Sequence, residues 1–179
     1  TCEALSAAFP DLELVTVPSF IVSDGPRETV TDPDRIVVGT TSPEAAQTVT
    51  AIMSKVAPGA LLLVLPPLEA ELVKLCSNVM LAAKVAVANE LAGVCAAFDS
   101  SWERIQAAVG LDRRIGRDHL GVTEEKGFEG ALARDLDGLV AAAASAGYAP
   151  AILQEMARFN RRVRSEARAR RSTDPVRTV

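Results

Sequence analysis

The longest regular hydrophobic pattern in the chain runs from Leu68 to Phe98, with no proline and a single glycine. Apolar residues recur there at helical spacing, and a continuous helix of this length would extend about 45 Å. The pattern forms two stripes, one of Leu72, Leu75, Val79, Ala82 and Ala86 and the other of Cys76, Met80, Ala83, Val87, Leu91 and Val94. A helix that is apolar on two sides needs cover on both, so we expect it to pack on its own domain and on a partner chain.

The residues before this helix predict a partial α/β layer. Helical spacing over 1–9 is followed by an alternating, β-branched strand pattern over 12–17 and a polar loop from 19 to 34. A second strand is predicted over 35–39, and Ser42-Pro43-Glu44 is a typical helix start for a helix over 43–56. The run 61–65 is wholly apolar, which predicts a third strand buried on both faces.

The residues after the long helix predict further helices. These are a short helix over 102–109 capped by Ser100-Ser101, an irregular glycine-containing segment over 111–130, an alanine-rich helix over 136–147 and a last helix over 151–170. The last helix would present Ile152, Leu153, Met156, Phe159 and Val163 on one face. The predicted fold is therefore mainly α, with a layer over 1–66, a helical domain over 67–171 and a frayed tail over 172–179.

Composition excludes several classes of function. A hydrophobic content of 49% indicates a globular chain, and a net charge of -4 argues against a nucleic-acid-binding protein, although eight arginines crowd the region from 158 to 177. Three cysteines without a CxxC pair favour a reduced, cytoplasmic protein. No run of about 18 residues lacks a charge, so we expect no membrane-spanning segment.

Polar residues interrupt the long helix at a few positions: Glu71, Lys74, Asn78, Lys84, Asn89 and Glu90. Their spacing alone favours the exposed or capped edge of a core helix. Lys74 and Asn78, however, are one turn apart on one face, so a cation and an amide donor can converge on a single oxygen.

The same positions resemble the central helix of the UDP-glucose/GDP-mannose dehydrogenase family, through Ala70-Glu71-Leu72-x-Lys74, Asn78, Leu81-Ala82-x-Lys84, Asn89-Glu90 and Cys95. Pro18-x-Phe20 and the run from Pro33 to Gly39 are similar to the end of the family's nucleotide-binding domain. Two family glutamates are replaced by Ser19 and Ser23, with Asp24 near the second. The resemblance implies the C-terminal part of a Rossmann-like domain, followed by a 6-phosphogluconate-dehydrogenase-C-terminal-like helical domain that forms a homodimer through Leu68–Phe98.

A second set of motifs resembles the family's substrate loops: Asp112-x-Arg114-Ile115-Gly116, then Gly127-Phe128-x-Gly130, then Arg134-Asp135. The resemblance implies that Arg114 binds the sugar nucleotide across the dimer and that Gly127, Phe128 and Gly130 support it. Without the resemblance we would interpret Arg114 as a solvated loop arginine. By the same resemblance, Lys74 and Asn78 stabilise the developing oxyanion and Asp135 orients the lysine, although ordinary helix contacts are an equal alternative.

Two parts of the family's chemistry are missing from the sequence. The catalytic cysteine of the family lies four residues before the aspartate, where this chain has Ala131, and a one-residue shift gives Leu132. No GxGxxG follows a strand, so we expect that NAD, the family's cofactor, is not bound by this chain alone. His119 is the only histidine, which leaves neither a histidine-based metal site nor a serine-histidine-aspartate triad.

The resemblance implies NAD-dependent oxidation of the 6-hydroxyl of a nucleotide sugar, by a chain that we expect to be truncated and catalytically impaired. The alternative is a non-catalytic dimerisation or sugar-nucleotide-binding module derived from that family.

Overall fold

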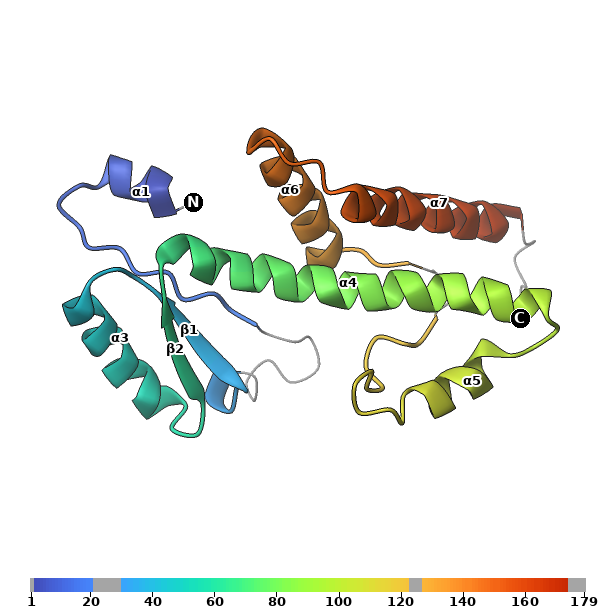
Figure 1. Cartoon of the computed structure of the whole chain (residues 1–179), viewed down its shortest axis with the longest axis horizontal. Helices are drawn as coiled ribbons and strands as arrows, with labels where there is room; N and C mark the ends of the chain where they lie inside the picture. The colour runs from blue at the N-terminus through green and yellow to red at the C-terminus, as the bar shows by residue number, and fades with distance from the viewer. Residues whose placement is uncertain (1, 21–29, 123–126, 174–179) are drawn as a thin grey trace. The chain divides into compact units, whose positions relative to one another are not determined.

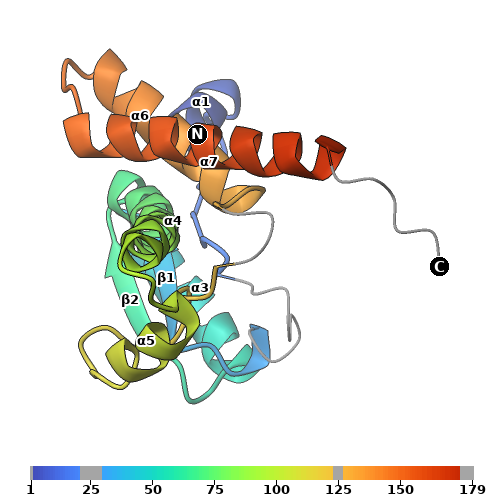
Figure 2. The same cartoon turned by 90° about the vertical axis from the view of Figure 1, so that its right-hand side faces the viewer.

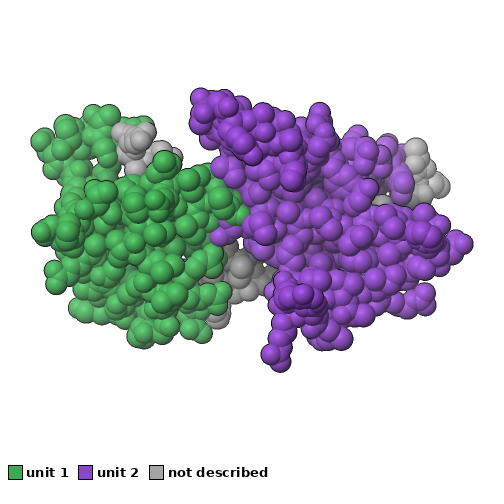
Figure 3. All heavy atoms as spheres, viewed as in Figure 1, with its two compact units in different colours: residues 1–76 green, residues 77–179 purple. Residues whose placement is uncertain are grey.

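The computed structural model describes residues 2–20, 30–122 and 127–173 (Figure 1). Ser23, Asp24 and the tail beyond 173 lie outside the described residues. The elements are α1 Cys2–Ala8, β1 Arg35–Gly39, α3 Pro43–Val56, β2 Leu61–Leu65, α4 Pro67–Ala97, α5 Trp102–Val109, α6 Ala131–Ser145 and α7 Ala151–Thr173. They form two compact units, Thr1–Cys76 and Ser77–Val179 (Figure 3). The boundary falls within α4, so this helix contributes to both units. The fold is mainly α with a partial α/β layer before it, as the hydrophobic pattern predicts.

The first unit is built on a parallel pair of strands joined by a helix. β1 and β2 pair in the register that places Arg35 opposite Leu61 and Gly39 opposite Leu65. The connecting helix α3 begins as predicted, since the Ser42 hydroxyl accepts a hydrogen bond from the amide of Ala45 at 3.2 Å. A small core of Ile36, Val38 and Ala57 lies between strand and helix.

Two predictions about this layer are wrong. Residues 12–17 form no strand, and only Thr16 pairs, through an antiparallel bridge with Gly39. β2 is not buried on both faces: Leu62 packs against the small core of this layer, whereas Leu61, Leu63 and Val64 are exposed, Leu61 to 61% of its surface.

Gly39 lies where β1 meets the start of α4. A Cβ atom added there would stand 2.6 Å from the Cβ of Ala70, which is closer than carbon atoms approach. The absence of a side chain at Gly39 therefore allows strand and helix to touch, and Ala70 is fully buried against it.

The second unit packs α6 and α7 together on one side of its part of α4, with α5 on the other (Figures 1 and 2). Its core joins Val79, Ala82 and Ala86 of α4 to Phe128, Leu136, Met156 and Ala157. These α4 residues belong to the first predicted stripe, so that stripe is the one this chain covers.

The second stripe of α4 is largely uncovered by the described chain. Met80 is 67% and Val87 56% exposed, and Cys76 is exposed as well. Only Ala83 of this stripe packs against the core. The two-sided pattern thus divides into one face that is used within the chain and one that is free.

Two details of the predicted helices differ from the structure. α6 begins at Ala131, five residues before the predicted start, because the chain turns into the helix directly at Gly130, whose φ is 63°. Ile152 was predicted to lie on the inner face of α7 but is 82% exposed, since the core is contacted one turn later by Met156 and Ala157.

The long helix α4 also has the length and hydropathy of a membrane-spanning helix, with a mean hydropathy of 1.6 over its most apolar 18 residues. From the sequence we expect no membrane-spanning segment because no long run lacks a charge, and that expectation did not anticipate that α4 meets these criteria. A single such helix is weak evidence for a membrane protein, because a central helix of a globular domain meets the same length and composition criteria.

Candidate functional site

Asn78 and Asp135, which are 57 positions apart in sequence, meet inside the second unit. The side-chain amide of Asn78, on α4, donates a hydrogen bond to the Asp135 carboxylate, on α6, at 2.5 Å. Asn78 is buried, so its amide is held in one orientation by this bond. The structure therefore brings together two of the three polar residues that the family resemblance selects.

Lys74, the third, lies one helical turn before Asn78 but belongs to the first unit. Its ammonium group is 5.5 Å from the centre of the Phe20 ring, and the guanidinium of Arg35 lies 4.3 Å from the same ring. Both contacts have the geometry of cation–π interactions. In this structure the lysine is thus engaged with the Pro18-x-Phe20 motif.

The two positions to which the resemblance assigns the family nucleophile, Ala131 and Leu132, lie in the first turn of α6. Ala131 is exposed there, immediately after Gly130, whereas Leu132 packs against the core. Of the two positions that the sequence leaves open, Ala131 is therefore the more exposed. Its methyl group cannot be deprotonated or attack a carbon atom.

The glycine-containing loop before α6 is held by two buried asparagines. Asn160 of α7 accepts a hydrogen bond from the amide of Phe128 at 2.8 Å and donates one to its carbonyl at 2.9 Å. Asn89 of α4 accepts a hydrogen bond from the amide of Gly127 at 3.2 Å and donates one to the carbonyl of Val85. The Phe128 side chain is in the core. The loop is thus clamped from both helices.

Gly127 is required by this clamp. Its φ of 69° lies in the left-handed region that favours glycine. A Cβ atom there would also stand 2.4 Å from the side-chain oxygen of Asn160. The resemblance selected Gly127 but not Asn160, which occupies the inner face of α7 between Met156 and Val163. An asparagine at helical spacing within an apolar face was the signal that could have identified it.

Arg114 lies on the loop after α5 and is 89% exposed. Its guanidinium donates two hydrogen bonds to the carboxylate of Asp112, at 3.0 and 2.6 Å. These bonds, with a third from the Arg114 amide, lower the pKa of Asp112 below its ordinary value of 3.8, and the carboxylate raises the pKa of Arg114. The loop is tied to α4 by Lys84, whose ammonium group donates to the carbonyl of Ile115 at 2.9 Å.

The described part of the first unit does not fit a dinucleotide cofactor. A pyrophosphate would need free backbone amides at the turn from β1 into α3. That turn has one glycine, Gly39, and the side chain of Ala70 takes up the space next to it. The start of α3 is capped by Ser42, has Pro43 in its first turn and carries the negative charge of Glu44. Ser42 already uses a backbone amide of the first turn, Pro43 has no amide N–H to offer, and the Glu44 carboxylate would repel a pyrophosphate.

Among the described residues there is no group of three or more histidine, cysteine or acidic side chains that could hold a metal ion. His119 is exposed on a loop with a φ of 63°.

Comparison with known proteins shows the family of this chain. Residues 68–162 match the UDP-glucose/GDP-mannose dehydrogenase family, central domain, and the chain belongs to that family. Among curated proteins it is similar to the UDP-glucose 6-dehydrogenase AglM of Haloferax volcanii, at 31% identity over 80% of this chain and 34% of the relative. It is also similar to the UDP-glucose 6-dehydrogenase of Rickettsia felis, at 36% identity over 58% of this chain and 23% of the relative.

Solved structures agree. A UDP-glucose dehydrogenase from Pyrobaculum islandicum superposes with a TM-score of 0.74 and 33% identity over 86% of this chain and 34% of that chain. A UDP-D-ManNAc dehydrogenase from Pyrococcus horikoshii has a TM-score of 0.76 at 17% identity, over 93% of this chain and 39% of that one, which shows a shared fold. The chain spans about a third of the length of these structures.

Proposed function

We propose that this chain is a UDP-glucose/GDP-mannose dehydrogenase-like protein that keeps polar groups for binding a nucleotide sugar but is impaired in oxidising its 6-hydroxyl. The observation that carries the proposal is the hydrogen bond between the buried Asn78 and the half-buried Asp135, with Lys74 one turn away on the same helix. An amide donor and a cation at this spacing suit a developing oxyanion. The named relatives are UDP-glucose 6-dehydrogenases, which supports the substrate class.

The impairment follows from the exposed alanine at the start of α6. Oxidation of an alcohol to an acid through a covalent intermediate needs a thiolate, which attacks the aldehyde carbon and later leaves from the thioester. Ala131 offers no such group, and neither Cys76 nor Cys95, both on α4, occupies that position in the sequence. NAD would serve as hydride acceptor in such an enzyme, but the described residues do not fit it.

In this proposal Arg114 contacts the nucleotide sugar. Its exposed guanidinium presents a planar fork that matches two phosphate oxygens. Binding would require exchange of its present partner, the Asp112 carboxylate, for the diphosphate. Asp112 would then hold Arg114 in position before the ligand arrives.

A non-catalytic dimerisation or binding module is the second candidate, and the free stripe on α4 favours it. A homodimer that buries Met80 and Val87 would remove their exposed apolar surface from water, and such burial contributes about 25 cal/mol per Å². We further propose that the protein is cytoplasmic, on the basis of its three cysteines, which are odd in number and show no CxxC spacing.

Calorimetric titration with UDP-glucose, UDP-glucuronate, GDP-mannose and NAD tests the proposal. We expect one of the nucleotide sugars to bind and NAD to give no heat. Arg114→Ala should weaken sugar-nucleotide binding by about tenfold or more, because a bidentate charged contact is lost. Arg113→Ala, which removes a neighbouring exposed loop arginine, is the matched control and should bind as the unmodified chain does. If no nucleotide sugar binds and light scattering gives a dimer, the result would favour the second candidate, a non-catalytic dimerisation module.

A further inference from the structure

Lys84 is one of the few charged residues of the long helix α4, and the proposed function gives it no role. Its side chain is half-buried, and its ammonium group donates a hydrogen bond to the backbone carbonyl of Ile115 at 2.9 Å. A lysine on a helix surface usually extends into water, whereas this one reaches a residue 31 positions away in the sequence. Both residues belong to the second unit.

The turn over 112–116 carries Arg114 and is closed by Asp112. The backbone carbonyl of Asp112 accepts hydrogen bonds from the amides of Ile115 and Gly116, both at 2.9 Å. The carboxylate of Asp112 accepts one hydrogen bond from the Arg114 amide and two from the Arg114 guanidinium. The turn is therefore closed by its own hydrogen bonds and needs no other element to keep its two charged residues together.

The hydrogen bond from Lys84 joins this turn to α4. Among the described residues, no other hydrogen bond or ion pair connects positions 112–116 with that helix. Asn78, which the proposed function places in the candidate site, lies six positions before Lys84 on α4, about 9 Å along the helix axis. Lys84 therefore determines where the turn stands relative to Asn78.

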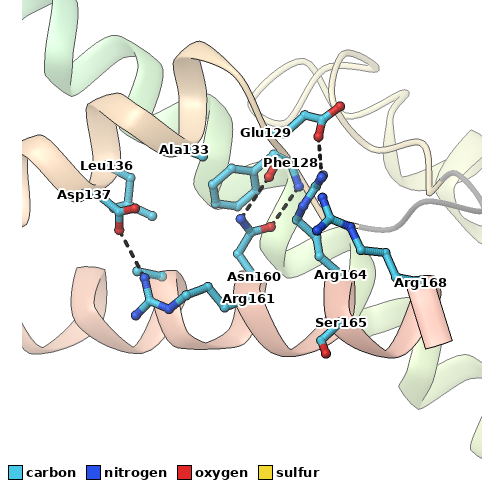
Figure 4. Close-up of a pocket in the computed structure, with 11 residues that line it drawn as sticks. Phe128, Glu129, Ala133, Leu136, Asp137, Asn160, Arg161, Arg164, Ser165 and Arg168 are labelled. Carbon is cyan, nitrogen blue, oxygen red and sulfur yellow. Dashed lines mark hydrogen bonds and ion pairs between the residues drawn. The ribbon is translucent and has the colours of Figure 1, made fainter.

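The glycine-containing loop before α6 is anchored in the same manner. Asn89 of α4 accepts a hydrogen bond from the amide of Gly127, and Asn160 of α7 makes two hydrogen bonds with the backbone of Phe128 (Figure 4). In both loops a polar side chain of a helix binds the backbone of the loop, and α4 supplies such a side chain to each. The long helix is thus the common support of the two candidate substrate loops.

We propose that Lys84 is a positioning residue for nucleotide-sugar binding, which holds the 112–116 turn on α4 and so fixes Arg114 where it meets the ligand. This role rests on the proposed function, in which Arg114 contacts the nucleotide sugar. Lys84 itself does not touch the ligand, because its ammonium group is directed at a carbonyl of the turn. A loop that is already held in place loses less conformational entropy when a ligand binds, so the affinity is higher.

The first test needs no ligand. NMR relaxation of the backbone amides measures how rigidly the turn is held, with order parameters of about 0.85 for a rigid backbone and below about 0.6 for a flexible one. In Lys84→Met, which removes the ammonium group, we expect the order parameters at Ile115 and Gly116 to fall towards the flexible value. Lys84→Arg can donate to the same carbonyl and should keep them. Lys55→Met, which replaces an exposed lysine of α3, is the matched control and should also keep them.

The second test is calorimetric titration of the whole chain with UDP-glucose, UDP-glucuronate and GDP-mannose. Lys84→Met should weaken the binding of the nucleotide sugar about three- to tenfold, and no more than Arg114→Ala does, because Lys84 acts through Arg114. Lys84→Arg should restore the affinity. In the Arg114→Ala background Lys84→Met should cause no further loss, since the residue that it positions is gone. Circular dichroism should show every variant folded.

Two results would overturn the role of Lys84. Unchanged order parameters at Ile115 and Gly116 in Lys84→Met would mean that the turn does not depend on this bond. A full further loss of affinity in the Arg114→Ala background would mean that Lys84 acts independently of Arg114. If none of the three nucleotide sugars binds the unmodified chain, the proposed function is wrong, and the relaxation data decide separately whether Lys84 anchors the turn.

Discussion

At the scale of single residues, the clamp on the glycine-containing loop gives the Asn160 side chain a large expected effect on stability. Asn160→Ala leaves the amide and carbonyl of Phe128 without partners in a buried place. Each unpaired buried group costs about 1–3 kcal/mol, so we expect the free energy of unfolding to fall by about 2–4 kcal/mol. Urea denaturation measures this. Glu166→Ala, at an exposed position of the same helix, should change it by less than about 0.5 kcal/mol.

The ion pair between Asp112 and Arg114 predicts that the stability of their loop depends on pH. Because Arg114 lowers the pKa of Asp112, the pair's contribution to stability is present above the ordinary pKa of 3.8 and is lost as the pH falls through the lowered value. The carboxylate resonance of Asp112 should therefore titrate below pH 3.8 in an NMR titration. In Arg114→Ala its midpoint should return towards the ordinary value, and an unchanged midpoint would contradict the assignment.

The candidate site residues within the motifs could be predicted from the sequence because the family pattern specifies them one by one. Asn78 and Asp135 were selected in this way, and the structure shows that they bond. Asn160 was missed because its role depends on a loop that lies far away in the sequence. The Asp112 partner of Arg114 lies only two positions away, but a charged pair in a loop has no periodicity that would reveal it.

At the scale of elements, the contact between β1 and α4 depends on a missing side chain. Gly39→Ala would place a methyl carbon 2.6 Å from the Cβ of Ala70, and both atoms belong to backbone-anchored groups that cannot rotate away. We expect strand and helix to shift and the free energy of unfolding to fall by about 1–3 kcal/mol. Thermal unfolding followed by circular dichroism measures the change. Gly59→Ala is the control, since a Cβ there meets nothing within 4 Å.

Most elements were predictable because local signals agree with the fold: α3 has its serine cap, and α4 has its unbroken apolar spacing. The errors occur where a neighbour decides the outcome. Residues 12–17 have strand composition, yet only Thr16 finds a partner. β2 has the composition of a central strand, but the described sheet ends with it. The composition of a segment shows what it can bury and not whether a partner is present.

At the scale of the whole molecule, the free stripe of α4 leads to the last prediction. Its exposed members, Met80, Val87, Leu91 and Val94, recur at helical spacing on one helix, and exposed apolar patches of this kind mark interaction sites. A second copy of the chain presents the same stripe, so two copies can cover each other through a twofold interface. We therefore expect a dimer when the mass is measured by light scattering.

Charged substitutions in that stripe test the interface directly. Met80→Lys and Val87→Lys should each shift the mass towards the monomer, because the lysine ammonium would have to be buried without a partner. Leu111→Lys replaces an equally exposed leucine on a loop and should remain dimeric. The helical content of each variant should stay unchanged, since both α4 positions are exposed in the single chain. A monomeric unmodified chain that instead sediments with lipid vesicles would contradict the dimer and assign the free stripe to a membrane.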